Sequence, residues 1–335
     1  MTPGVYITFD VECSMGGAWG DNTLRPVPPS RAMMGEYGDK KLGLPLICRT
    51  LNDNSLAATF FVEAFTDEQG HPGQTAPVCR FLMDQGQDVQ LHVHPNHKHY
   101  GLKQQGKPFT FTDQLADLEP EAQREMLEEA CEIIRQWTGR RPVAFRAGNM
   151  GADEQSLEQM ARVGIRIDSS YTFPYLGGQC RFADREKYNG SKWYGKVLEL
   201  GLSGFEHPRL PGLHPAQPLD LMGTSFEECR DAIRMICGAG ADAVIILHSF
   251  SLIKTRNYQY DGGRLNWIVA RRFRRLCEWL ADNASEFPSY TFDQLATAIE
   301  AGRYEPKAVP PCRMGKVLRS YVRRAVQLYN RAYWT

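Results

Sequence analysis

Seven short apolar runs, separated by longer stretches, constrain the fold more than any other feature of this sequence. They are rich in β-branched and aromatic residues, as buried strands are, and cover residues 5–9, 58–62, 89–93, 143–145, 165–167, 197–200 and 244–247. Amphipathic helical patterns lie between several of them, at residues 119–137, 154–163, 226–237 and 265–281. Strands that alternate with helices predict an α/β fold with a parallel sheet, and seven strands indicate a distorted, closed or nearly closed (β/α) barrel. The alternative is an open, doubly wound sheet. The lack of a glycine-rich loop after the first strand argues against it.

The composition fits a globular protein with a large core, since 42% of the 335 residues are hydrophobic. The 39 basic and 39 acidic residues cancel, so no net charge attracts the chain to nucleic acid. The nine cysteines are odd in number and none forms a CxxC pair, so we expect reduced packing residues. The sequence begins without a signal-peptide pattern and has no membrane-spanning apolar stretch, so we expect a cytoplasmic protein.

Two segments lack any clear periodicity. Residues 14–43 are rich in glycine and proline, and residues 96–112 are polar with several histidines and lysines. Loops that follow the carboxyl ends of the strands form the active face of a parallel barrel. We therefore predict that both segments, with the aromatic segment 171–175, form the wall of a substrate site.

The end of the chain is basic, because no acidic residue follows Glu305. We predict a catalytic barrel over residues 1–305 and a basic amphipathic tail helix over residues 306–335. Such a helix either lies on an anionic membrane surface, here through residues 313–332 at the inner membrane face, or docks its apolar stripe on the barrel. The basic residues are Lys307, Arg313, Lys316, Arg319, Arg323, Arg324 and Arg331, and the stripe is Leu318, Tyr321, Val322, Ala325, Leu328, Tyr329 and Ala332.

Two carboxylates end the first predicted strand. Because side chains alternate along a strand, Asp10 and Glu12 point to one side and Val11 to the other. Two carboxylates that project together need a cation or an arginine to offset their repulsion. The alternative is a solvated strand end.

Histidines gather at the end of the third predicted strand. Four of the eight histidines in the chain, at positions 92, 94, 97 and 99, fall within eight residues. His92 and His94 alternate on one strand face, so both imidazoles can point at one centre. Two neutral imidazoles and one carboxylate suit a Zn²⁺ site with open positions for water and substrate. We expect His97 and His99 on the surface of the following loop.

Three further strand ends carry polar residues. Arg146 needs a carboxylate partner if it is buried, and Gly148 and Gly151 beside it allow the backbone to approach a ligand closely. Asp168 and His248 end two other strands. Because a barrel brings its carboxyl ends together, these polar ends predict one catalytic centre.

The ordered motifs TFDVE (8–12), LHVHP (91–95), FRAG (145–148), DSS (168–170) and LHS (247–249) resemble those of the polysaccharide deacetylase family, carbohydrate esterase family 4. The likeness covers about residues 4–250 and is strongest to the branch associated with lipopolysaccharide and other surface-glycan synthesis. It implies a distorted barrel of fewer than eight strands, a bound divalent metal, commonly zinc, and hydrolysis of N-acetyl groups on sugars.

The resemblance also implies roles for individual residues. Asp10 matches the general base, Arg146 the arginine that pairs with it, and His248 the histidine that protonates the leaving amine or stabilises the oxyanion. Asp168 matches an aspartate that orients this histidine. The implied metal ligands are Glu12, His92 and His94.

Two positions depart from the family pattern. The usual second aspartate, a metal ligand, is Val11 here, and Glu12 one position later takes that part. The usual His-x-x-x-His spacing would place a histidine at Asn96, so the histidine pair is His92 with His94, or one of these with His97.

The resulting prediction is a metal-dependent N-deacetylase of an amino-sugar glycan or of a lipid- or nucleotide-linked precursor. The alternatives are a deformylase or cyclic-amide hydrolase with the same metal site, or a non-catalytic sugar-binding protein.

Overall fold

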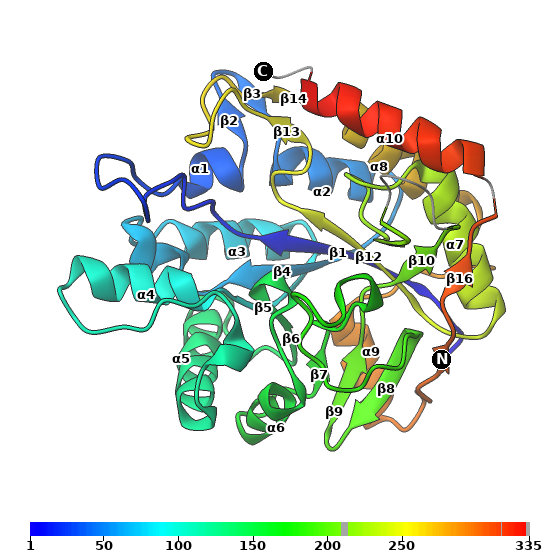
Figure 1. Ribbon diagram of the computed structural model, residues 1–335, viewed down its shortest axis with the longest axis horizontal. Coiled ribbons are helices and arrows are strands. Elements are labelled where there is room, and N and C mark those ends of the chain that lie inside the picture. Colours follow the sequence, from blue (N-terminus) through cyan, green and yellow to red (C-terminus); the bar gives the residue numbers. More distant parts are fainter. Residues whose placement is uncertain (209–213, 316, 333–335) are drawn as a thin grey trace.

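The protein is built on one curled sheet of nine strands, seen in a computed structural model that describes residues 1–208, 214–315 and 317–332 (Figure 1). Seven adjacent strands are parallel, and the last two, β8 and β15, are antiparallel additions at one edge. The parallel strands are the seven apolar runs expected from the sequence. In sheet order the strands are β12 (Ala243–His248), β1 (Val5–Val11), β4 (Thr59–Glu63), β5 (Asp88–Val93), β6 (Ala144–Ala147), β7 (Ile167–Asp168), β9 (Val197–Leu200), β8 (Asn189–Tyr194) and β15 (Ala308–Val309).

The sheet forms a half-barrel, because no strand in the described part of the chain joins its two edges. Irregular segments fill the gap beside β12: Ser203 donates its N–H to the carbonyl of Val244 at 3.1 Å, and Ile246 donates to Leu219 at 3.1 Å. These bonds satisfy backbone groups at an edge that would otherwise be unpaired. The predicted distorted, mostly parallel barrel is therefore confirmed.

Helices cover the outer surface of the sheet, and the four expected from the sequence form at nearly the predicted bounds. Capping boxes set the start of α6 through Asp153, of α7 through Ser225 and of α9 through Thr291. The outer helices are α2 (Leu44–Asn52), α3 (Thr75–Asp84), α5 (Pro120–Thr138), α6 (Glu154–Arg162), α7 (Phe226–Gly238) and α8 (Trp267–Asp282), with α9 (Phe292–Glu300) at the amino ends of the strands.

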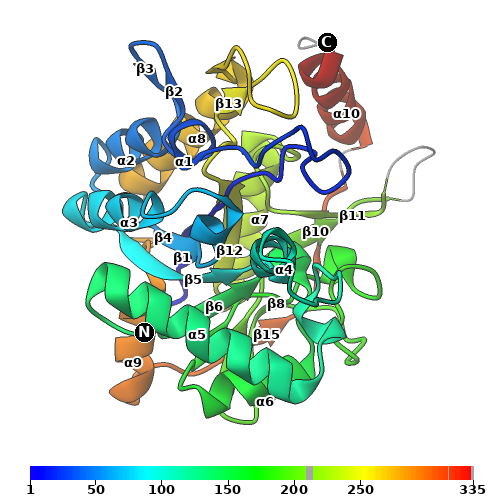
Figure 2. The ribbon, with the colours of Figure 1, turned by 90° about the vertical axis from the view of Figure 1, so that its left-hand side faces the viewer.

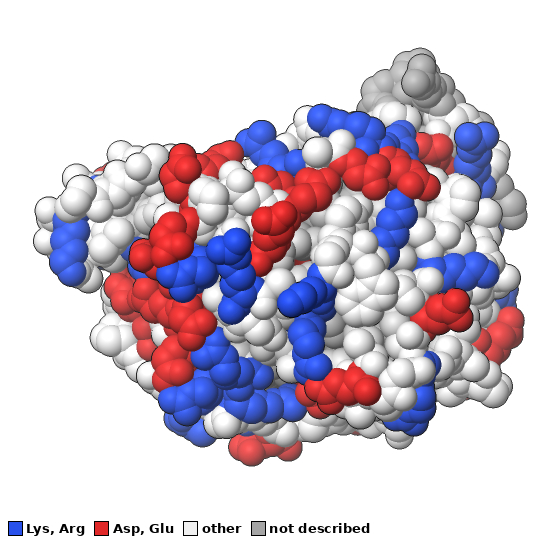
Figure 3. Space-filling view, turned by 90° about the horizontal axis from the view of Figure 1, so that it is seen from below, with Lys and Arg blue, Asp and Glu red and all other residues white. Residues whose placement is uncertain are grey.

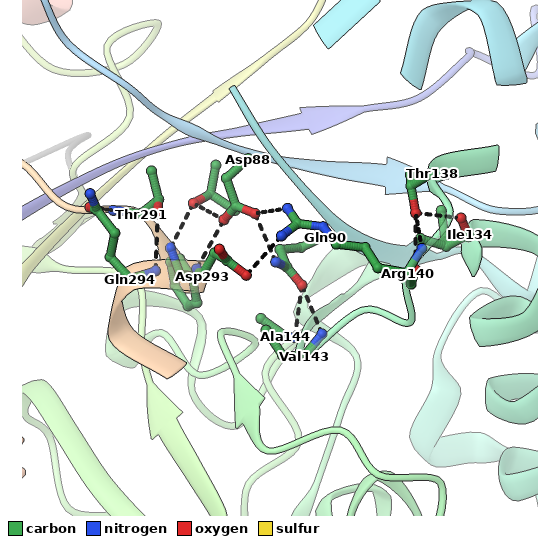
Figure 4. Close-up of polar contacts among 12 residues, drawn as sticks. Asp88, Gln90, Ile134, Thr138, Arg140, Val143, Ala144, Thr291, Asp293 and Gln294 are labelled. Atoms are coloured by element: carbon green, nitrogen blue, oxygen red, sulfur yellow. Dashed lines mark hydrogen bonds and ion pairs between the residues drawn. The ribbon is translucent and has the colours of Figure 1, made fainter. Parts of the chain in front are cut away.

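A buried polar network ties α9 to those amino ends (Figure 4). The Asp88 carboxylate accepts hydrogen bonds from Thr59 Oγ1 at 2.9 Å and from the N–H of Asp293 at 3.2 Å. Its other oxygen accepts from Gln90 Nε2 at 2.8 Å and lies 3.3 Å from Arg140 Nη2. Burial raises the pKa of Asp88, while Gln90 and Thr59 act in the opposite direction. The network fixes the end of the barrel opposite the polar strand ends.

The prediction that residues 96–112 form an irregular loop was wrong for its first part, where α4 (Pro95–Gln104) forms. Pro95 sits in the first turn, where its fixed φ favours a helix. His97 and His99 were expected on the surface, but only 3% and 6% of their surfaces are exposed, because the helix is covered. The Phe109 ring, for instance, stacks on His99 with centroids 6.1 Å apart. A polar helix of this kind leaves no apolar periodicity in the sequence.

Residues 14–43 are largely irregular, as expected. They contain only short elements, α1 (Pro29–Ala32), β2 (Glu36–Tyr37) and β3 (Lys40–Lys41). The remaining short strands are β10 (Gly204–Glu206), β11 (Ala216–Pro218), β13 (Ile253–Lys254), β14 (Arg264–Leu265) and β16 (Cys312–Arg313).

The first residues of the predicted tail are part of the barrel, because β15 joins the main sheet and β16 pairs with β10. The helix α10 (Val317–Ala332) follows, and it docks through Ser320 and Arg323, which are 2% and 3% exposed. The apolar stripe does not dock: Leu318 is 76% exposed and Leu328 is 50% exposed. Lys316, residues 333–335 and the side chains of Arg331 and Ala332 lie outside the described part of the chain.

No helix in the described ranges is long and apolar enough to cross a membrane. All nine cysteines are free, as predicted. On the face seen in Figure 3, basic and acidic side chains lie in neighbouring clusters, so neither sign dominates it. Arg135 and Arg141 of α5 and the turn after it, for example, pair with Glu132 and Glu128 at 2.6 and 3.0 Å.

Candidate active site

The carboxyl ends of the parallel strands enclose a cavity of about 160 Å³. Figure 2 looks onto this end of the sheet, with α4 and the loop that follows β1 in front of it. Five of the residues predicted from strand ends line the cavity together. The lining residues are Asp10, Glu12, His92, His94, Asn149, Met150, Tyr175, Gln179, Leu202, Pro218, Asp220, Ile246 and His248.

Arg146 lies behind the cavity and is fully buried. Its Nη1 donates to Asp10 Oδ1 at 2.6 Å, its Nη2 to Thr8 Oγ1 at 2.9 Å, and its Nε to the carbonyl of Ser169 at 3.2 Å. The guanidinium also lies over the Phe61 ring, 4.2 Å from the centroid. These contacts fix the plane of the guanidinium and leave the second oxygen of Asp10 free to face the cavity.

Glu12, His92 and His94 form a compact cluster beside Asp10. Glu12 Oε2 lies 2.6 Å from His94 Nε2 and 3.4 Å from His92 Nε2. The three ligand atoms all lie within 4.8 Å of one another. One oxygen and two ring nitrogens converging in this way form a donor set that could hold a divalent cation.

The hydrogen bonds of the two rings test whether a cation fits. His92 Nδ1 lies 2.8 Å from the carbonyl oxygen of Arg146, which can only accept, so this nitrogen carries the proton. Its Nε2 is then the lone-pair atom, and this buried atom has no hydrogen-bond partner. His94 Nδ1 lies 2.9 Å from Asp113 Oδ1, which again directs Nε2 toward the cluster. Such outer partners are typical of metal-binding histidines, so the residues fit a metal.

Burial would raise the pKa of the Glu12 carboxyl, but the His94 and His92 imidazoles hold it well below its usual value. For His94, burial alone would lower the pKa, but Glu12 and Asp113 raise it well above the usual value. Each group therefore favours the charged form of the other. A cation at this place would compete with the proton on His94 Nε2.

Sequence reasoning missed the residues that hold His94. Asp113, in the loop after α4, bonds His94 through one oxygen and the Asn149 side chain through the other. Asn149 and Met150 have φ of 52° and 57°, a left-handed conformation that is costly for residues other than glycine and that clusters at functional sites. Gly148 lies so close to the His94 ring that a Cβ would overlap with it. No spacing motif links these positions to the histidines.

Glu63, at the end of β4, was also missed. It is fully buried, and its carboxylate accepts from the N–H of Phe65 at 2.8 Å and of His94 at 2.6 Å. Burial raises the pKa of Glu63 to about 7, against the influence of His94 and His92. A carboxylate at the end of an apolar strand was the available signal, since the same signal identified Asp10.

His248, on the strand next to β1, lies beside the cluster, with Nε2 3.8 Å from Glu12 Oε1. Its Nδ1 is buried and has no hydrogen-bond partner. Asp220 is the other acidic residue of the cavity. Burial raises the pKa of Asp220, and the nearby His248 and Arg272 act in the opposite direction.

Asp168 does not take the place expected for it. Its carboxylate accepts from Ser170 Oγ at 2.7 Å and from the N–H of Ser170 at 3.2 Å, and it lies beside Glu199. It is buried on β7, four strands beyond β1 in the sheet, and it does not line the cavity. The predicted role of Asp168 in orienting His248 is therefore not one that this geometry provides, and the carboxylates near His248 are those of Glu12 and Asp220.

Of the alternative ligands, His97 does not enter the cluster found among the described residues, and Asn96 does not line the cavity. The His97 ring stacks on His94, with centroids 4.9 Å apart, and its Nδ1 faces Glu63 at 3.8 Å. The arrangement favours His92 with His94 as the histidine pair.

A family model described as polysaccharide deacetylase matches residues 36–167, which include His92, His94 and Arg146. No curated protein matches the chain.

Among solved structures, a Mycobacterium smegmatis protein provisionally named a polysaccharide deacetylase is similar with a TM-score of 0.55 and 16% identity, over 93% of this chain and 95% of that one. A family 4 carbohydrate esterase from Streptomyces lividans, in complex with acetate, has a TM-score of 0.43 and 13% identity over 84% and 91%. The peptidoglycan deacetylase PdaC from Bacillus subtilis has a TM-score of 0.44 and 13% identity over 90% and 93%.

The first of these structures shares the fold of this chain. The family-model match thus likens residues 36–167 to the polysaccharide deacetylases, and the shared fold extends over nearly all of the chain.

Proposed function

We propose that this protein is a metal-dependent hydrolase that removes an N-acetyl group from an amino sugar of a glycan or glycan precursor. One observation carries the proposal: the Glu12–His92–His94 cluster, the Asp10–Arg146 pair and His248 meet at one cavity. A base, an acid and a cation site at one place are what amide hydrolysis requires.

Glu12, through its carboxylate, and His92 and His94, through Nε2, would hold the cation, for which zinc suits the donor set. When bound, a divalent cation polarises an acyl carbonyl and lowers the pKa of water. Asp10 would accept the proton of the attacking water through the oxygen that Arg146 leaves free. Arg146 keeps that carboxylate in place.

His248 would give a proton to the departing nitrogen. Its ring borders the cavity on the strand next to that of Asp10, and it is stacked on Phe250 with centroids 5.0 Å apart, which limits its rotation. One proton thus passes from water to Asp10, and another passes from His248 to the departing amine.

The test combines metal analysis with product release. The purified chain should contain about one divalent ion per molecule and release acetate from N-acetylated amino sugars. Asp10→Asn and His248→Ala should each lower the rate by about 10²–10⁴-fold, the usual worth of a general base or acid. Asp39→Asn, in the exposed turn between β2 and β3, is the control.

The outcomes separate the alternatives. Release of formate in place of acetate would indicate a deformylase, and opening of a cyclic amide would indicate the related hydrolase. Sugar binding without metal and without any hydrolysis would make the protein a sugar-binding protein. The lipopolysaccharide or other surface-glycan context stays a prediction from the sequence motifs.

We also propose that α10 contacts an anionic membrane surface, at the inner membrane face. The support is its exposed apolar stripe, with Tyr321, Val322 and Tyr329 at 44%, 54% and 54% exposure, in a helix rich in arginine. Sedimentation with anionic vesicles should fall when Leu318 and Leu328 are both changed to serine. Equal sedimentation of the two proteins would contradict the contact.

A further inference from the structure

We propose that a groove between the candidate active site and α10 binds the phosphate of a phosphate-linked amino sugar. The inference rests on the proposed function and narrows its substrate class to glycosyl phosphates or diphosphates. The groove is a second cavity, of about 570 Å³, whose lining includes Tyr175, Pro218, Asp220, Arg323, Arg324 and Gln327.

The groove adjoins the catalytic cavity. Tyr175, Pro218 and Asp220 line both, so a molecule with its N-acetyl group at the metal cluster has a direct continuation into the groove. Figure 2 shows α10 near β10 and β11, at one side of the face onto which the active site opens. The groove is also more than three times as large as the catalytic cavity, which leaves room for a substituent beyond the sugar.

The far end of the groove contains an arginine that has an ion pair but no hydrogen bond to its carboxylate partner. Arg323 is only 3% exposed, and its Nη1 has no hydrogen-bond partner among the residues that the structure describes. Glu228 Oε1 is 3.7 Å from this atom, beyond hydrogen-bond distance. A buried guanidinium with an unused N–H is costly, and a bound anion would satisfy it.

Arg324 adds a second positive charge at the same end. It lines the groove and is close enough to Arg323 to lower the pKa of Arg323, together with the larger effect of burial. The structure gives Arg324 no ion pair within the described residues. Two guanidinium groups in this position match the several oxygens of a phosphate, to which arginine donates in a bidentate manner.

The acidic and basic side chains of the groove lie at its opposite ends. Its one carboxylate, Asp220, lies at the catalytic end next to His248. The α10 end presents Arg323, Arg324 and the amide of Gln327. An anionic group is therefore favoured at α10 and disfavoured at Asp220. The substrate then has one orientation, with its amide at the Glu12–His92–His94 cluster and its phosphate at α10.

Arg324→Gln is the decisive variant because its side chain is partly exposed and its loss leaves no buried charge. The matched control is Arg313→Gln, which removes the same charge from the same tail at a side chain that is 87% exposed and outside the groove. Arg323→Gln is a second variant, used only if its thermal unfolding matches that of the wild type.

Acetate release is measured on N-acetylglucosamine, on its 1-phosphate and on its uridine diphosphate ester. Arg324→Gln should raise KM for the phosphorylated substrates by about tenfold, the effect of ~1.4 kcal/mol, without changing the rate on the neutral sugar. Arg313→Gln should behave as the wild type. An equal effect of Arg324→Gln on neutral and phosphorylated sugars, or no effect on either, would overturn the inference.

A binding measurement separates this inference from the proposed function. Calorimetric titration with pyrophosphate should detect binding to the wild type and to Arg313→Gln, and weaker binding to Arg324→Gln. If no sugar is hydrolysed but this pattern is found, the proposed reaction fails and the anion site stands. If hydrolysis is found and pyrophosphate binds all three proteins alike, the anion site fails alone.

The same titration distinguishes two sources of the phosphate. Stronger binding of uridine diphosphate than of pyrophosphate would indicate a nucleotide-linked sugar. Stronger binding of a short-chain prenyl phosphate would indicate a lipid-linked one.

Discussion

Arg146 Nη1 and Asp10 Oδ1 lie 2.6 Å apart with the side chains 0% and 2% exposed, so this ion pair is almost completely removed from water. The two residues come from β6 and β1, which β4 and β5 separate in the sheet. The arginine therefore crosses the inside of the half-barrel to reach the carboxylate. The pair is a structural element of the core as well as part of the candidate active site.

Removing one member of this pair should destabilise the protein strongly. Arg146→Met leaves Asp10 as an unpaired buried carboxylate, and such a loss costs about 3–5 kcal/mol of unfolding free energy. The double variant Asp10→Asn with Arg146→Met removes both charges and should recover part of that stability. Urea unfolding measures both. A double variant as unstable as Arg146→Met would show that the lost packing of the guanidinium, not the unpaired charge, dominates.

Asp113 should control metal affinity although it is not part of the cluster. Asp113→Ala removes the acceptor of His94 Nδ1 and should weaken metal binding by about 10–100-fold, the usual effect of losing such an outer partner. Asp113→Asn keeps an acceptor oxygen and should lose less. Competition with a chromophoric chelator measures the affinity, and Asp39→Ala serves as control. Equal affinity of Asp113→Ala and the wild type would contradict this role.

The grouping of the polar strand ends could be predicted from the sequence. In a parallel sheet the carboxyl ends of all strands lie along one edge, so the side chains at these ends lie near one another. That rule placed Asp10, Glu12, His92 and His94 correctly around one cavity, and it indicated a carboxylate partner for Arg146. It failed for Asp168, because β7 is short and its last residue turns toward Glu199 and Ser170. The sequence predicts where a strand ends. It does not predict which way a side chain points where the hydrogen-bonded pairing of the strands stops.

Other parts of the site depend on contacts with no local signal. Asp113 reaches His94 from an irregular loop, and Asp220 reaches the cavity from the segment that fills the open side of the half-barrel. The tail helix shows a related difficulty. Its hydrophobic stripe predicted the wrong docking face, because Arg323 is buried by tertiary contacts where helical periodicity places it on the polar side.

Gly148 should be required for the position of His94. Gly148→Ala places a Cβ 2.4 Å from His94 Nδ1, so the ring must move from the position in which it meets Glu12. We expect metal affinity to fall by at least about tenfold, as for a lost outer partner, while the fold persists. Gly106→Ala is not a suitable control because that residue has a positive φ, whereas Gly238→Ala, with open space around it in α7, is suitable. Unchanged affinity in Gly148→Ala would show that the ring adapts.

The network around Asp88 should contribute to stability without affecting the reaction. Asp88→Ala leaves Thr59 Oγ1 and the N–H of Asp293 without their buried acceptor, and each such group costs about 1–3 kcal/mol. Urea unfolding should show this loss, while the rate per folded molecule stays near that of the wild type. A fall in rate with unchanged stability would place Asp88 in the catalytic machinery, contrary to its position at the amino ends of the strands.

Glu199 should make the protein less stable as the pH rises. Burial, followed by the neighbouring Asp168, raises the pKa of Glu199 well above its usual value, and its Oε2 has no hydrogen-bond partner. The native state therefore keeps a proton that an unfolded glutamate releases above its pKa of about 4.3. This contribution is fully present below that pH and is lost as the pH rises toward the raised pKa, by up to ~1.4 kcal/mol per pH unit.

Glu199→Gln replaces the carboxyl with a group that never ionises. Above about pH 4.3 the unfolded glutamate ionises, so the unfolding free energy of the wild type should fall with pH more than that of this variant. The difference in unfolding free energy between the two proteins should therefore grow with pH. Urea unfolding at several pH values measures it, with exposed Glu119→Gln as control. Parallel pH profiles of the wild type and Glu199→Gln would mean that Glu199 is ionised in the native state, its charge offset by the N–H of Tyr171 at 3.0 Å.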